Sequence, residues 1–180
     1  QCFAEEGASI RAIRRVYLQH SKYQHNEELT PKDIYDIANG TKEGDAQAAI
    51  RAFTEMGEIV GDALANAITL IDGLIVIGGG LAGAASLFLP ALVNEMNKPI
   101  QRLDGSEVPR LEVKVFNLEN EEEFKLFATG EATQVPIPGT HKFVPYDPMK
   151  RIGVGLSRLG TSKAIALGAY TFALYTLDRL

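Results

Sequence analysis

The stretch Gly73-Leu-Ile-Val-Ile-Gly-Gly-Gly80 decides the fold class of this 180-residue chain. Its residues from Gly73 to Ile77 read as a strand, and apolar side chains on both faces are typical of a strand buried in a parallel sheet. Three glycines follow, and then small and apolar residues from about Ala82 to Met96. The pattern predicts a strand, a tight turn and a buried helix.

A long helix is predicted immediately before this strand. From about Gly44 to Ile71, apolar residues recur at three- and four-residue steps and form one stripe. Gly57, Gly61 and Ala65 lie on an adjacent strip, spaced by four residues. Glycine inside a helix costs about 0.5–1 kcal/mol relative to alanine. We therefore expect close backbone contact between this strip and another element.

The remaining segments complete a helix-rich α/β class, predicted as one partial domain over residues 1–180. The stretch from Thr129 to Pro148 is rich in Pro, Gly and Thr, so we expect a long excursion or irregular arm there. The other predicted elements are helices over Ser9 to about His20, Thr30 to about Ala38 and onward from Thr161, and strands over Leu111–Leu118 and Ile152–Leu156.

Composition argues against two classes of partner. The net charge is −5, and the densest charge run is acidic, Glu119 to Glu123, which would repel a nucleic-acid backbone. The span from Gly73 to Asn94 carries no charge, but three glycines near its middle and Pro90 favour a strand, turn and helix over a membrane span. We expect no nucleic-acid and no membrane contact.

The single cysteine, Cys2, cannot form an internal disulfide, which fits a reduced cytoplasm.

The glycine turn is compatible with two kinds of ligand-binding site, and also with a turn that binds no ligand. Backbone N–H groups between a strand and a helix can approach a phosphate or nucleotide when no side chain blocks them. Gly78-x-Gly80-x-x-Gly83 also satisfies the fingerprint of dinucleotide-binding oxidoreductases, but that fingerprint expects an acidic residue about 20 positions on. Here Asp104 lies in a polar turn and Glu119 lies well beyond. A tight turn without a ligand is the third interpretation.

Three segments resemble the ROK family of sugar kinases and sugar-responsive repressors. The segment from Gly61 through Ile71-Asp-Gly-Leu-Ile-Val-Ile-Gly-Gly-Gly80 is similar to the family's long helix, strand and triple glycine. The closing Leu159-Gly160 and Leu167-Gly-Ala-Tyr-Thr-Phe-Ala-Leu174 are similar to its C-terminal helix, and Glu5-Glu-Gly-Ala-Ser9 resembles its Glu-x-x-Ala-Ser segment. The match covers most of the chain and is weakest over residues 98–148.

The resemblance implies the C-terminal portion of an actin-like ATPase fold, as found in sugar kinases. Gly78, Gly79 and Gly80 would then bind the adenosine and phosphate end of ATP, carried with Mg²⁺, and Glu5 would accept hydrogen bonds from sugar hydroxyls. The expected function is part of a glucokinase-like hexose kinase. The alternative is the sugar-sensing domain of a ROK repressor. Family members are often oligomers, so we also expect a homo-oligomer.

Several family motifs are absent from these residues. The phosphate-binding Asp-x-Gly-Gly-Thr segment, the catalytic Asp and the Glu-x-Gly-His sugar motif are expected before Gln1, in an N-terminal lobe. Of the family's zinc cluster, only Cys2 could be a remnant, and it is one residue out of register with Glu5, so no zinc is expected. Phosphoryl transfer needs nucleophile, metal and phosphates positioned together. We therefore expect no catalytic residue and no kinase activity in this chain by itself.

Overall fold

The centre of the molecule is a pair of helices, α4 (Ala46–Ile68) and α5 (Ala85–Asn97). The computed structural model describes residues 3–23 and 29–179. A side-chain carbon added at Gly57 would collide with the carbonyl oxygen of Phe88, and one at Gly61 with that of Leu92. Both contacts advance by four residues in each helix, so the two helices run in the same direction. They also confirm the predicted close contact along the glycine strip.

Three shorter helices pack against α4: α1 (Ala4–Gly7), α2 (Ile10–His20) and α3 (Pro31–Ala38). Ser9 caps α2 by accepting a hydrogen bond from the Ala12 N–H at 3.3 Å. Thr30 and Asp33 form a capping box at the start of α3. Both predicted helices are thus confirmed. Their buried side chains join a core in which Tyr17, Ile34 and Phe53 are fully enclosed.

A three-stranded parallel sheet lies beside the helices, in the order β1 (Ile75–Ile77), β7 (Arg151–Leu156) and β4 (Lys114–Asn117). The register pairs Ile75 with Val154 on one side of β7, and Lys114 with Arg151 on the other. The central strand, β7, comes last in the sequence. The α/β class is therefore as predicted.

The first strand is less buried than its sequence predicts. β1 has only three residues, and its Ile75 and Ile77 pack against the core, while Val76 is 67% exposed. The preceding Leu74 is 63% exposed. The prediction of a strand buried on both faces is wrong within the part of the chain that the structure describes, because β1 is at the sheet edge and has only one covered face. A short 3₁₀ helix, η1 (Gly80–Ala84), then leads into α5.

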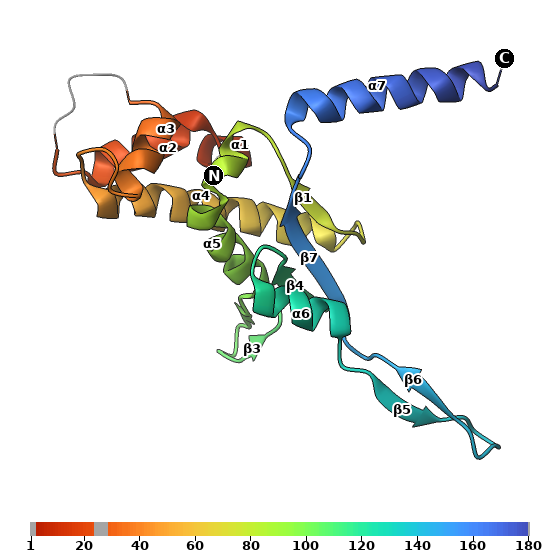
Figure 1. Cartoon of the computed structure of the whole chain (residues 1–180). Helices are drawn as coiled ribbons and strands as arrows, with labels where there is room; N and C mark the ends of the chain where they lie inside the picture. The colour runs from red at the N-terminus through yellow and green to blue at the C-terminus, as the bar shows by residue number, and fades with distance from the viewer. Residues whose placement is uncertain (1–2, 24–28, 180) are drawn as a thin grey trace.

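The segment between α5 and β7 contains most of the irregular structure. A small hairpin of β2 (Ile100–Gln101) and β3 (Glu107–Val108) precedes β4. The acidic run then begins α6 (Glu121–Thr129), which is capped by Asn120. The expected excursion is present, but it is regular: β5 (Thr133–Pro136) and β6 (Phe143–Tyr146) form an antiparallel hairpin that projects from the body (Figure 1).

The last helix, α7 (Thr161–Leu177), leaves the opposite end of β7 from the hairpin (Figure 1). From Ser162 onward its residues are exposed, although most of them are apolar. The helix itself was predicted correctly. Among the described residues, no helix combines the length and the apolar character needed to cross a membrane.

Candidate functional site

The glycine turn follows β1 at the carboxyl edge of the parallel sheet. The Ile77 carbonyl oxygen accepts a hydrogen bond of 2.8 Å from the Ser157 N–H, which ties the end of β1 to β7. Gly79 then has a φ of 95°, a conformation that residues with a side chain rarely adopt. The sequence therefore needs glycine at position 79 for the backbone path itself. In open α/β sheets, this edge is where ligands bind.

The outer surface of the turn is open. A side-chain carbon added at Gly79, Gly80 or Gly83 would meet no other atom within 4 Å, apart from the glycine's own neighbours. Internal packing therefore does not require glycine at positions 80 and 83. The open surface instead leaves room for a ligand to approach the backbone closely.

A pocket of about 290 Å³ opens beside the turn. Its lining combines the glycine turn with α3 and α4, and is mostly apolar. The Tyr35 and Phe53 rings meet edge to face with 6.5 Å between their centroids, and the Lys32 ammonium lies 5.9 Å from the Tyr35 centroid. The lining residues are Pro31, Lys32, Tyr35, Phe53, Gly80, Leu81, Gly83 and Ala84. An apolar pocket with aromatic rings and one cation suits a flat, electron-rich ring.

The N-terminal part of α3 is held firmly in place at the rim of this pocket. Asp33 accepts a hydrogen bond from Lys42 Nζ at 2.7 Å and others from the Thr30 hydroxyl and backbone N–H. The Lys42 bond, followed by those from Thr30, holds the pKa of Asp33 well below its usual range. Lys32 Nζ in turn contacts the Asp36 carboxylate at 2.7 Å. The first turn of α3, at the pocket rim, is thus fixed by hydrogen bonds to two carboxylates.

The structure brings only part of the predicted site together. Gly80 lines the pocket, with Gly78 and Gly79 directly before it on the turn. Glu5 lies exposed in α1 and does not line this pocket. Its role toward a sugar stays a prediction. Cys2, named for a possible zinc remnant, lies outside the described residues.

Sequence reasoning missed Lys32, Tyr35 and Phe53. Their local patterns are those of a short surface helix and a core position, and α3 meets the glycine turn only through long-range packing. A lysine one turn before a tyrosine next to a helix cap is too common to indicate a ligand. No sequence signal could have found this pocket.

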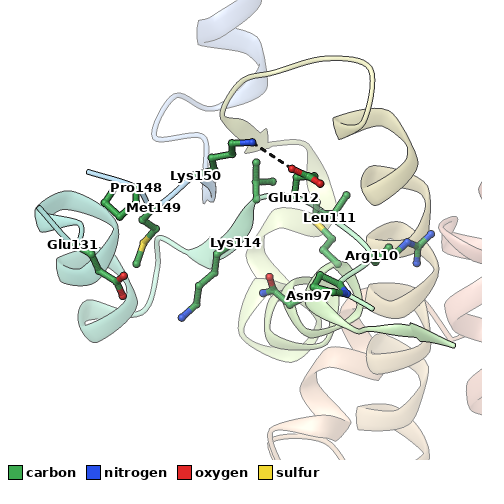
Figure 2. Close-up of a pocket in the computed structure, with 12 residues that line it drawn as sticks. Asn97, Arg110, Leu111, Glu112, Lys114, Glu131, Pro148, Met149 and Lys150 are labelled. Carbon is green, nitrogen blue, oxygen red and sulfur yellow. Dashed lines mark hydrogen bonds and ion pairs between the residues drawn. The ribbon is translucent and has the colours of Figure 1, made fainter. Parts of the chain in front are cut away.

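A second pocket, of about 390 Å³, lies at the amino ends of the strands, opposite the glycine turn, near the starts of β4 and β7 (Figure 2). Its polar groups are largely engaged with the protein. Lys150 Nζ pairs with Glu112 at 3.3 Å, and the Asn97 amide both donates to and accepts from the Val115 backbone. None of the predicted site residues lines it.

The described residues offer no ready-made metal cage. No group of three or more His, Cys, Asp or Glu in residues 3–23 and 29–179 is arranged to hold an ion.

The sheet order argues against the dinucleotide-binding alternative. In that fold the strand after the fingerprint helix lies next to the first strand. Here α5 leads to β4, and β7 lies between β1 and β4. Asp104, the nearest acidic residue at the expected distance, instead accepts hydrogen bonds from Ser106 within a turn. The dinucleotide-binding interpretation is therefore not supported.

Two solved structures are similar to this chain. The crystal structure of glucokinase from Parabacteroides distasonis is 50% identical and superposes with a TM-score of 0.82, covering 96% of this chain and 46% of that one. A chain from Cytophaga hutchinsonii is 21% identical, with a TM-score of 0.49, over 89% of this chain and 40% of its own. No curated protein matched the sequence. This chain thus spans less than half of the glucokinase.

The similarity to the glucokinase identifies the fold as a helix-rich α/β part of the actin-like ATPase fold. The family model described as "ROK family" matches residues 1–122. That match covers α1 to α5, the glycine turn and β1 to β4. The chain therefore belongs to the ROK family.

Proposed function

We propose that this chain is the C-terminal lobe of a two-lobe sugar kinase and forms the adenosine side of its ATP site. The observation that carries the proposal is the apolar pocket that joins the open glycine turn to Tyr35 and Lys32. The full-length enzyme would transfer a phosphoryl group from ATP to the primary hydroxyl of glucose or a related hexose. The 50% identity to a glucokinase supports this reaction over the repressor alternative.

Each part of the pocket has a distinct task in this proposal. The Tyr35 ring and the apolar wall from Leu81 to Ala84 enclose the adenine. Lys32 contributes positive charge at the rim. The backbone at Gly79 and Gly80 approaches the ribose and phosphates, because no side chain stands in the way. Mg²⁺ would arrive with the nucleotide and neutralise phosphate charge. The nucleophile-activating carboxylate would come from the N-terminal lobe.

The test compares two identical substitutions in the full-length protein. Gly79→Val forces a side chain into a positive-φ position on the open face of the turn. Gly73→Val is the matched control, because it also meets open space but lies before β1 and has no positive φ. We expect Gly79→Val to reduce hexose-dependent ADP release at least ten-fold, and Gly73→Val to retain it.

The assay uses ATP, magnesium and a panel of hexoses, with thermal denaturation to check that both variants are folded. Tyr35→Ala should raise the KM for ATP more than that for the sugar, and Tyr35→Phe should preserve both. Equal activity of the two glycine variants would contradict the nucleotide role of the turn. Sugar binding without any ADP release from the wild-type protein would favour the repressor branch.

A further inference from the structure

Glu119 begins the acidic run, yet its carboxylate is turned toward the sheet. Glu119 Oε1 accepts a hydrogen bond from the Leu156 N–H at 3.0 Å, and Oε2 accepts one from the Arg158 guanidinium at 3.0 Å. The Glu119 side chain is 23% exposed, whereas that of Arg158 is 80% exposed. An acidic residue that serves solubility alone would face water. Its contacts instead fix Glu119 to the end of β7.

The Leu156 bond continues the sheet where β4 stops. β4 ends just before Leu118, whose N–H still donates to the Val154 carbonyl of β7 at 2.9 Å. Alternate residues of a strand direct their N–H and C=O groups to the same side, so the Leu156 N–H is the next donor that faces β4. Its acceptor is a side-chain oxygen of Glu119 in place of a strand carbonyl. Glu119 therefore holds β7 beyond the end of β4.

Two glycines of β7 leave room for this arrangement. A side-chain carbon added at Gly153 would collide with Leu118, and one added at Gly155 would lie 3.7 Å from Glu119 Oε1. The Glu119 backbone is fixed as well, because its N–H donates to Asn117 Oδ1 at 3.0 Å and Asn117 is buried. Glu119 is thus held in place on the side of its backbone as well as on the side of its carboxylate.

The residue after Leu156 joins this support to the glycine turn. Ser157 donates its N–H to the Ile77 carbonyl at 2.8 Å, and Ile77 directly precedes Gly78. A side-chain carbon added at Gly78 would lie 3.6 Å from Ser157 Cβ, so the two segments are neighbours. Glu119 does not line the pocket beside the turn. Any effect of Glu119 on a nucleotide therefore has to pass through the end of β7.

We propose that Glu119 is a positioning residue for the glycine turn. By holding the end of β7, it fixes where Gly78 and Gly79 present their backbone to the nucleotide, and in this respect the proposal rests on the function proposed above. The two bonds of the carboxylate contribute unequally. The pair with Arg158 is largely exposed and contributes little. The loss of Glu119 would leave the Leu156 N–H without its acceptor in the sheet, so this bond positions the turn.

The first test uses two truncations in the full-length protein to separate positioning from stability. Glu119→Ala removes the acceptor at the carboxyl end of the sheet, beside the turn. Asn97→Ala is the matched control, because the Asn97 amide bonds the Val115 backbone of the same sheet, but near the start of β4. With hexose at saturation, Glu119→Ala should raise the KM for ATP about three- to ten-fold, as expected for one lost hydrogen bond, and leave the KM for hexose unchanged. Asn97→Ala should change neither KM.

Conservative variants identify the bond that is responsible. Glu119→Gln keeps an oxygen that can accept from the Leu156 N–H, and Arg158→Ala removes only the partner of the ion pair. Both variants should stay within about two-fold of the wild-type KM for ATP. If either is as impaired as Glu119→Ala, the ion pair holds the turn and the role assigned to the Leu156 bond is wrong.

Hydrogen–deuterium exchange of the nucleotide-free protein gives a readout that does not depend on activity. Glu119→Ala should speed amide exchange at residues 78–81 at least about three-fold, and Asn97→Ala should not. An unchanged KM for ATP or unchanged exchange in Glu119→Ala would overturn the proposal. If Gly79→Val then still abolishes ADP release, the nucleotide role of the turn stands without Glu119. If Gly79→Val keeps full release, the proposed function itself is wrong, and the exchange measurement alone decides whether Glu119 holds the turn.

Discussion

Two helices of similar composition have opposite surroundings in this molecule. Both α4 and α7 are rich in apolar and small residues and contain internal glycine. In α4, Gly57 and Gly61 lie against the backbone of α5, whereas Gly168 in α7 has no atom near the position of a side-chain carbon. The comparison teaches that a glycine inside a helix marks a contact only when a second element comes close.

The same contrast extends to the larger side chains. Leu92 of α5 is fully buried, while Leu174 of α7 is 44% exposed. A helix that is apolar on every side is stable when other elements cover it. We therefore expect the α4–α5 pair to determine the stability of this chain, and α7 to contribute little to it. Three pairs of measurements can break or sharpen that view.

The largest difference is expected between two leucine truncations. Leu92→Ala leaves a cavity in the core and should lower the free energy of unfolding by about 2–5 kcal/mol. Leu174→Ala should change it by less than about 0.5 kcal/mol. Urea unfolding followed by circular dichroism measures both, since the chain has no tryptophan for fluorescence. Equal losses would mean that α7 is packed in solution.

Replacing glycine by alanine should give effects of opposite sign in the two helices. Gly61→Ala forces a methyl group against the Leu92 carbonyl and should destabilise the chain by about 1–3 kcal/mol. Gly168→Ala meets open space and should stabilise α7 by up to about 1 kcal/mol. The same urea experiment compares the two. A neutral Gly61→Ala would show that α4 and α5 can separate without loss.

The smallest effect concerns the start of α3. Asp33→Asn removes the carboxylate of the capping box and should cost about 1 kcal/mol at pH 7. Because the folded pKa of Asp33 lies below the unfolded value of about 3.9, its contribution is present above that pH and is lost as the pH falls through the folded pKa.

Urea unfolding of wild type and Asp33→Asn at pH 7 and pH 3 checks the sign: the difference between them should shrink at pH 3. Lys42→Met provides a reference, because it removes the leading cause of the low pKa but keeps the Thr30 cap. A difference that grows on acidification would contradict a lowered pKa.

Local features of the fold were predictable because local residues determine them. Ser9 and Thr30 begin helices at the expected positions, and the apolar stripe of α4 fixes its length within a few residues. The ring contact between Tyr35 and Phe53, by contrast, depends on how α3 is placed on α4. No periodicity encodes that placement. The partial exposure of β1 was missed for a similar reason, since Val76 has the same sequence pattern whether or not its second face is covered.

The candidate site likewise has a part that local sequence predicts and a part that depends on long-range packing. Gly79 was identifiable because a triple glycine after a strand implies a special backbone path, and its φ of 95° agrees with that. The pocket around the turn was not, because its other wall comes from residues before the long helix. The hairpin arm was anticipated only as irregular chain, since its prolines suppress the usual strand pattern at Pro136 and Pro145.

The position of β7 has a consequence for how this protein is made. β1 and β4 do not pair with each other; both pair with a strand that is synthesised after them. On the ribosome, the helical pairs can assemble early, while the two outer strands wait with unpaired edges until residue 156 has emerged. Synthesis that stalls before this point would leave apolar strand edges exposed to neighbouring chains. The synthesis of β7 therefore determines when the strand edges of the nascent chain are covered and no longer promote aggregation.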